Sequence, residues 1–152
     1  MLLKLVRQKY VQDGTMAITD IDEDDTEQTS SIMVNSPTYR HISGVYKVWK
    51  YGNYGYMWEK KIPNTTISYI LFFSSQQLGN VNSVDGSYIY IYCYDTTQNI
   101  HHMEMIAQCC IIKKNGEEMC RWYIQDKQTL NWNHVTNINY QIMRSEKYSS
   151  FY

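Results

Sequence analysis

Residues 105–126 read MIAQCCIIKKNGEEMCRWYIQD, and Asn115-Gly116 stands between two apolar runs in the middle of this stretch. Both residues tolerate the positive φ that a two-residue type I′ hairpin turn requires. Such a turn would pair Lys114 with Glu117, which places opposite charges directly across the two strands. The stretch therefore predicts a β-hairpin whose register is fixed by its turn.

The same register sorts the hairpin side chains into two faces, because residues two apart in a strand point to the same side. One face is almost wholly apolar and is expected in a core, whereas the other mixes polar and apolar residues. The further pairs expected are Lys113–Glu118, Ile112–Met119, Ile111–Cys120, Cys110–Arg121 and Cys109–Trp122. The apolar face comprises Met105, Ala107, Cys109, Ile111, Cys120, Trp122 and Ile124.

Strand-like alternation continues through most of the chain after His41. It is cleanest over Ser87–Asp95, and a last strand is predicted from Leu130 to Met143, with His134 and Ile138 on the same apolar face. About seven strands at spacings of about ten residues predict a mostly β fold, a single antiparallel sandwich or barrel-like domain. An α+β fold with one antiparallel sheet is the alternative.

The charges divide the chain into a charged N-terminal arm, residues 1–39, and an antiparallel β domain, residues 40–152. The arm holds three Lys or Arg and seven Asp or Glu, although the net charge of the whole chain is only −1. Its first ten residues form a short basic amphipathic pattern, for which we predict contact with a membrane surface or a neighbouring subunit. The residues predicted to make this contact are Leu2, Leu3, Lys4, Arg7 and Lys9.

Four cysteines and the absence of a signal-peptide pattern predict an intracellular, reducing compartment with free thiols. No apolar run approaches the length of a transmembrane helix, so no transmembrane segment is expected. Cys109 and Cys110 are adjacent in a strand and should point to opposite faces, which disfavours a structural zinc site. We therefore predict neither a metal nor another cofactor.

Motifs that carry catalysis are missing from the sequence. There is no Gly-x-Ser-x-Gly elbow, no phosphate-binding glycine loop and no His-Glu-x-x-His. The cysteines lie in the middle of predicted strands, where thiolates are rarely activated. We predict a protein that is not an enzyme, with a small Cys/His enzyme as one alternative.

Two sets of residues are candidates for binding. Four tyrosines alternate with aliphatic residues over the predicted strand 87–95, where they either cover a second packed layer or form an exposed interaction face. A predicted hairpin interleaves lysines with aromatic residues, as surfaces that stack on single-stranded nucleic acid do. The tyrosines are Tyr88, Tyr90, Tyr92 and Tyr94. The predicted nucleic-acid contacts are Lys47, Trp49, Lys50, Tyr54, Tyr56, Lys60 and Lys61.

These features favour a virus-type structural or accessory protein, matrix- or capsid-like, that acts by self-association and by binding protein partners. Tyrosine and tryptophan give large contact area at low entropic cost, and a bias towards Asn, Ile, Lys and Tyr accompanies AT-rich genomes such as those of many viruses. The partners expected are further copies of the chain or another protein, with peripheral membrane contact. A single-stranded nucleic-acid-binding protein is the second alternative.

Overall fold

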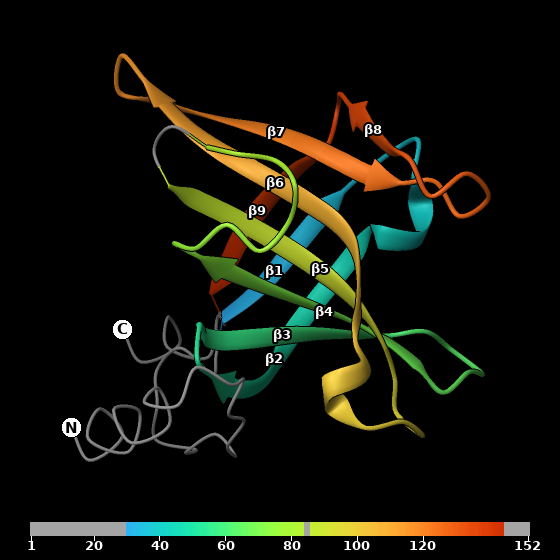
Figure 1. Cartoon of the computed structure of the whole chain (residues 1–152). Coiled ribbons are helices and arrows are strands. Elements are labelled where there is room, and N and C mark those ends of the chain that lie inside the picture. The colour runs from blue at the N-terminus through green and yellow to red at the C-terminus, as the bar shows by residue number, and fades with distance from the viewer. Residues whose placement is uncertain (1–29, 84–85, 145–152) are drawn as a thin grey trace, which may run out of the picture.

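The computed structural model describes residues 30–83 and 86–144, and these form one antiparallel sheet of nine strands (Figure 1). The described residues contain no α-helix, so the predicted mostly β fold is confirmed. Two 3-10 turns, η2 (Arg40–Ile42) and η3 (Ile100–His102), accompany the sheet. The strands are β1 (Ser30–Asn35), β2 (Gly44–Gly52), β3 (Gly55–Lys61), β4 (Ile67–Ser74), β5 (Ser87–Asp95), β6 (Glu104–Lys114), β7 (Glu117–Gln125), β8 (Trp132–Val135) and β9 (Asn139–Arg144).

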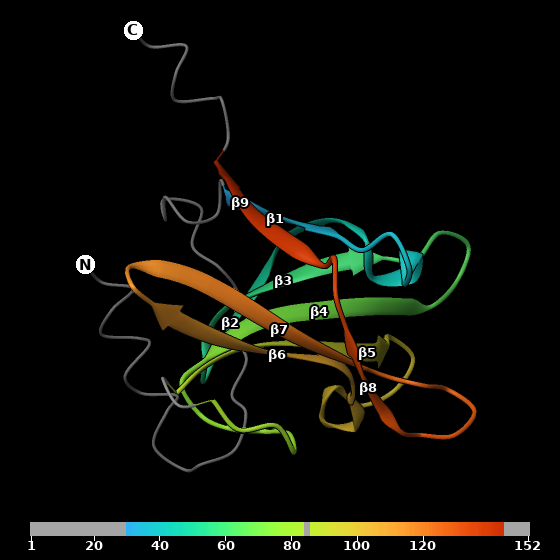
Figure 2. The same cartoon turned by 90° about the horizontal axis from the view of Figure 1, so that it is seen from above.

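The order of the strands explains the shape of the sheet. Strands β1 to β8 form a meander in which each pairs with the next, and β9 then pairs with β1 at the far edge. Only residues 136–138 connect β8 to β9, so the two edges of the sheet must approach each other there. The sheet therefore curls into a half-barrel, and Figure 2 shows β9 and β7 on the two sides of its opening.

The β6–β7 hairpin has the register that its sequence predicts. Lys114 lies opposite Glu117, and every further expected pair down to Cys109–Trp122 is present. Asn115 and Gly116 have φ values of 55° and 79°, as a type I′ turn requires. The apolar face of the hairpin lies inside the curl, where Trp122 and Cys109 are fully buried.

The sheet packs on both of its faces, and this gives the small domain two hydrophobic layers. The inner layer fills the curl with buried aliphatic and aromatic side chains from β1 to β7 and from η2. The outer layer lies on the convex side of β3 to β6. The buried outer residues are Met57, Ile70, Phe72, Tyr88, Tyr90 and Cys110.

The last predicted strand, Leu130–Met143, is wrong as a single element. Asn137 has a φ of 66°, and the chain bends there from the β7 edge of the sheet to the β1 edge. Val135 faces inward on β8, and Ile138 faces inward immediately after the bend, so the inward face changes from odd to even numbers. His134 consequently lies outside, exposed, with its ring centroid 5.3 Å from that of Tyr123.

The sheet begins earlier than the expected boundary between residues 39 and 40. Strand β1 lies within the predicted arm, between β2 and β9, and its Ile32 and Val34 are buried. These two residues alternate with less buried neighbours, which is the pattern of a short strand with one face in a core.

The membrane or subunit contact predicted for Leu2, Leu3, Lys4, Arg7 and Lys9 lies outside the described residues and stays a prediction. Among residues 30–83 and 86–144, no helix is long and apolar enough to cross a membrane.

Candidate functional site

The two predicted binding sets meet on the outer face of the sheet. Because β2, β3, β4 and β5 are neighbours, the tyrosines of β5 lie on the same surface as the aromatic residues of β2 and of the β2–β3 turn. We call this surface the outer aromatic face. It comprises Trp49, Tyr54, Phe72, Tyr88, Tyr90, Tyr92 and Tyr94.

Close ring contacts connect most of this surface. The ring centroids of Trp49 and Tyr94 are 5.8 Å apart, although β3 and β4 lie between their strands. Tyr54 stacks on Phe72 with centroids 5.3 Å apart, and Tyr92 lies 5.5 Å from the same phenylalanine. Such aromatic pairs stabilise packing beyond the area they bury. The rings of the outer aromatic face are therefore held in place by contacts with one another and are not separate exposed side chains.

The four tyrosines of β5 divide into two pairs. Tyr88 and Tyr90 are buried, because residues 76–83 fold over them. The backbone N–H of Leu78 donates to the Tyr90 hydroxyl at 2.8 Å, and that of Ser83 donates to the Tyr88 hydroxyl at 2.9 Å. This pair belongs to a second packed layer, whereas Tyr92 and Tyr94 stay half-buried at the surface.

Gln108 of β6 holds residues 76–83, which we call the covering segment, in place on the outer side of the sheet. It is 1% exposed. Its side-chain oxygen accepts from the N–H of Val81 at 3.3 Å, and its amide nitrogen donates to the side chain of Asn80 at 2.6 Å. Both the oxygen and the nitrogen of this buried amide are hydrogen-bonded, and breaking these bonds would leave buried polar atoms without partners. The segment therefore has a fixed position on the sheet.

The lysine-rich set splits between the two faces. Lys47 and Lys61 are exposed on the outer side, and the Lys50 ammonium lies 5.4 Å from the centre of the Trp49 ring. Tyr56 is buried in the inner layer. Lys60 points inward as well.

The ammonium of Lys60 donates to the backbone carbonyls of His41, at 2.8 Å, and of Ser43, and burial lowers its pKa. The Lys60 ammonium therefore forms hydrogen bonds with backbone carbonyls at and next to η2, and it does not contribute to the outer surface. The structure brings five of the seven predicted nucleic-acid contacts together on the outer side: Lys47, Trp49, Lys50, Tyr54 and Lys61.

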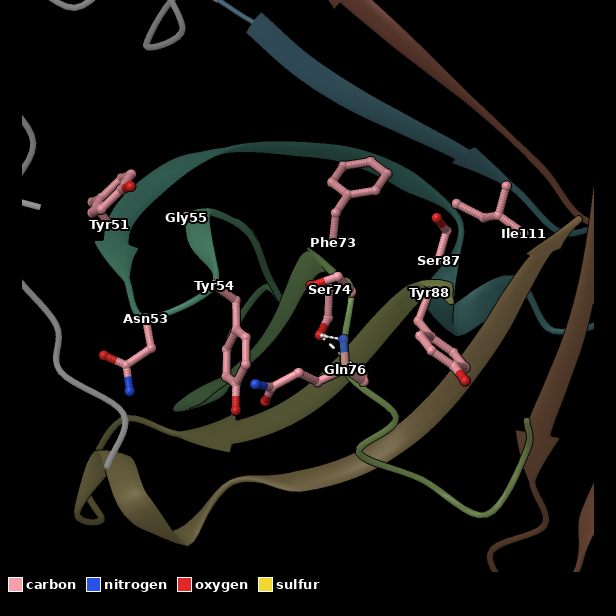
Figure 3. A pocket seen from close by; sticks show the side chains of 11 residues that line it. Tyr51, Asn53, Tyr54, Gly55, Phe73, Ser74, Gln76, Ser87, Tyr88 and Ile111 are labelled. Carbon is pink, nitrogen blue, oxygen red and sulfur yellow. Dashed lines mark hydrogen bonds between the residues drawn. The ribbon is translucent and has the colours of Figure 1, made fainter. Parts of the chain in front are cut away.

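A cleft of about 600 Å³ adjoins the outer aromatic face at one end of the sheet (Figure 3). Tyr54 and Tyr88 belong to both surfaces, and Phe73 projects to the opposite side of the sheet in Figure 3. The Ser74 hydroxyl donates to the carbonyl of Gln76 at 3.0 Å and accepts from its N–H at 2.9 Å, which fixes the turn at the cleft wall. The lining residues are Tyr51, Asn53, Tyr54, Gly55, Phe73, Ser74, Ser75, Gln76, Ser87, Tyr88 and Ile111.

The described lining of the cleft is uncharged. No Asp, Glu, Lys, Arg or His is among the described residues that line it, which offer rings, hydroxyls and amides. Burial raises the pKa of Tyr92 to about 12 and also raises that of Tyr90. These phenols are therefore protonated at neutral pH, where they can form hydrogen bonds but are not available as bases.

None of the four cysteines is among the described residues that line the cleft. Cys109 is buried in the inner layer and Cys110 in the outer layer, so the adjacent thiols point to opposite faces as expected. Burial raises the pKa of both thiols. All four cysteines are free, and within the described part of the chain no three His, Cys, Asp or Glu side chains gather as a metal site would need.

No protein-family model, no curated protein sequence and no solved structure gives a significant match to this chain.

The cleft and the covering segment were not predicted from the sequence. Residues 76–86, which include Gly79-Asn80 and Asp85-Gly86, are predicted as a loop. The described residues 76–83 do form a loop, but the sequence does not indicate which way it folds. The available signal was the ladder of four tyrosines. Two hydroxyls on buried rings need hydrogen-bond partners, and the nearest loop supplies them.

Proposed function

We propose that the chain is a non-enzymatic binding protein, which recognises protein partners through the outer aromatic face and the adjoining cleft. The observation that supports this most is the continuity of half-buried rings with a cleft whose described lining residues carry no charged side chain. Tryptophan and tyrosine in such positions are the residues that most often dominate the energy of protein interfaces.

A neutral cleft favours a neutral peptide segment over a charged ligand. Aromatic rings can contact its apolar side chains, while the serine hydroxyls and the amides of the cleft suit its backbone groups. The described lining residues of the cleft offer no carboxylate or imidazole for proton transfer, so binding without chemistry is the simpler role. A virus-type structural or accessory protein remains a prediction that rests on sequence composition alone.

Selection from a displayed library of random peptides tests this proposal. Peptides enriched on the wild-type chain should be rich in uncharged residues, and Trp49→Ala should weaken their binding by about thirtyfold or more, as expected for an interface hot spot worth about 2 kcal/mol. Leu130→Ala, at a residue 65% exposed, is the matched control and should leave binding unchanged. If no peptide distinguishes the wild type from Trp49→Ala, the outer aromatic face is not the binding surface.

A single-stranded nucleic-acid binder is the second candidate. It is favoured by the position of Lys47, Lys50 and Lys61 beside Trp49 on one side of the sheet, where rings can stack on bases and ammonium groups can contact phosphates. Fluorescence anisotropy with a labelled oligonucleotide tests it. Binding should fall steeply with salt and should be weakened by Lys47→Ala, whereas no binding at low salt would exclude this candidate.

A further inference from the structure

The connection between β8 and β9 changes which side chains of the chain face the inside of the half-barrel. On β8, Val135 lies opposite Trp122 and faces the inside of the half-barrel. On β9, Tyr140 lies opposite Val34 and also faces inside. Inward residues are therefore odd-numbered before the connection and even-numbered after it. Asn137 allows this change by adopting a left-handed φ of 66°.

The sequence alternates across this connection without a break. Trp132, Ile138, Tyr140 and Ile142 are all even-numbered, so a straight strand would carry them on one face. The local pattern thus favours a single strand. The bend is required only because β8 and β9 of one chain must both pack into the same half-barrel.

Strand β9 is held to the remainder of the described fold mainly by β1. Its ladder runs from Ser30–Arg144 to Asn35–Asn139, and no other described strand pairs with it. The Tyr140 hydroxyl donates to Glu118 across the opening of the half-barrel at 2.5 Å. Ile142, although it faces the inner side, is 53% exposed beside a cavity of about 450 Å³ at this opening. An edge strand with one ladder and a short hinge is suited to exchange between copies.

We propose that two copies of this chain associate by exchanging β9. Residues 136–138 straighten, β8 and β9 become one strand, and the β9 of each copy pairs with the β1 of the other. Every β1–β9 pair then forms again between chains, and only the hinge changes conformation.

In the straight strand, the side chains of β9 that face inward in one chain would face the inside of a half-barrel again. Its even-numbered residues face away from the chain's own half-barrel at Trp132 and His134, and they face into the second copy at Tyr140 and Ile142. The two half-barrels would lie on opposite sides of the shared strands. This exchange uses a different part of the sheet from the outer aromatic face, so it is independent of the proposed function.

Substitution of Asn137 tests the exchange. Valine disfavours a left-handed φ, whereas glycine adopts it without steric cost. The strain of a left-handed valine in the monomer favours the straight hinge of the dimer by about tenfold for each hinge. Because a dimer contains two hinges, Asn137→Val should lower the dimer dissociation constant by about a hundredfold. Asn137→Gly should not lower it. Sedimentation velocity over a range of concentrations measures both variants after a warm incubation that allows β9 to detach.

A disulfide distinguishes exchange from other dimers. Ser31 and Met143 lie directly opposite on β1 and β9. In Ser31→Cys/Met143→Cys combined with Asn137→Val, oxidation should join two chains on a non-reducing gel, and the two single-cysteine variants control for native thiols. Links within one chain, or a Val variant that stays monomeric, would overturn the proposal.

Two further variants complete the test. If Asn137→Val does not fold, Asn137→Ala makes the same measurement with a smaller expected change, and no change in dissociation constant would overturn the proposal. Trp49→Ala should leave the exchange unaltered. If it abolishes the dimer, self-association belongs to the outer aromatic face and not to β9.

Discussion

Substitution of Gly79 by alanine should detach the covering segment from the outer aromatic face. A Cβ at residue 79 would lie 2.1 Å from the side-chain oxygen of Gln108, 2.9 Å from its Cδ and 3.1 Å from the sulfur of Met105. Gln108 is buried and cannot swing into water. The new methyl group must therefore displace either the Gln108 amide or the segment that carries Asn80 and Val81.

The expected cost follows from the hydrogen bonds that this displacement breaks. The Gln108 amide makes two of them, to Asn80 and Val81. Their loss costs about 1 kcal/mol each, and a buried amide left without partners adds about 1–3 kcal/mol. We expect the free energy of unfolding to fall by about 3–5 kcal/mol. For a domain of this size, that lowers Tm by roughly 6–20 °C.

Urea denaturation followed by tryptophan fluorescence measures this change, and a double-mutant cycle tests its cause. Gln108→Ala removes the amide that Gly79→Ala would strike, so the alanine at residue 79 should cost under about 1 kcal/mol in that background. An equal cost in both backgrounds would refute the proposed contact between residues 79 and 108.

Three other outcomes are expected. Gly116→Val should cost about 1–2 kcal/mol or more in urea denaturation, because Gly116 has a φ of 79°; intact stability with loss of one binding activity would contradict the structural role of the hairpin turn. The pKa of Tyr92 is raised to about 12, so the folded state keeps a proton that the unfolded state loses. Stability should therefore be fully present below pH 10 and decline as pH rises to about 12; Tyr92→Phe should reduce this decline, and an unchanged urea midpoint in the wild type would argue against it. Burial, then Lys127 and then Lys60 lower the pKa of His41. Lys60→Met should raise that pKa in an NMR titration, and a pKa that does not move would show that the ammonium is not felt at the imidazole.

The sequence predicts local pairing well in this protein. The β6–β7 register follows from Asn115-Gly116, because the turn fixes which residues are opposite and the side-chain period of two then fixes both faces. The alternation of Ser87–Asp95 is likewise correct, with Ile89 and Ile91 in the inner layer. Both features depend only on residues close in the chain.

Features that depend on distant residues could not be predicted. The turn-over at Asn137 comes from the closure of the half-barrel, which the alternation of residues 130–143 does not contain. The contact between Trp49 and Tyr94 requires the order of four strands, and the inward direction of Lys60 requires the carbonyls beside η2. Strand order and burial are properties of the whole sheet, so the candidate site was predicted as two separate sets rather than as one surface.

The pairing of β1 with β9 has a consequence for synthesis on the ribosome. β1 leaves the ribosome before β9, and the strand that covers its second edge is made about 110 residues later, roughly 5–20 s at ordinary elongation rates. During this interval the N–H and C=O groups on that edge can pair with a strand from a neighbouring nascent chain, since an uncovered edge accepts any extended segment. Polysomes, which hold several such chains close together, would therefore favour early pairing between chains of the same message.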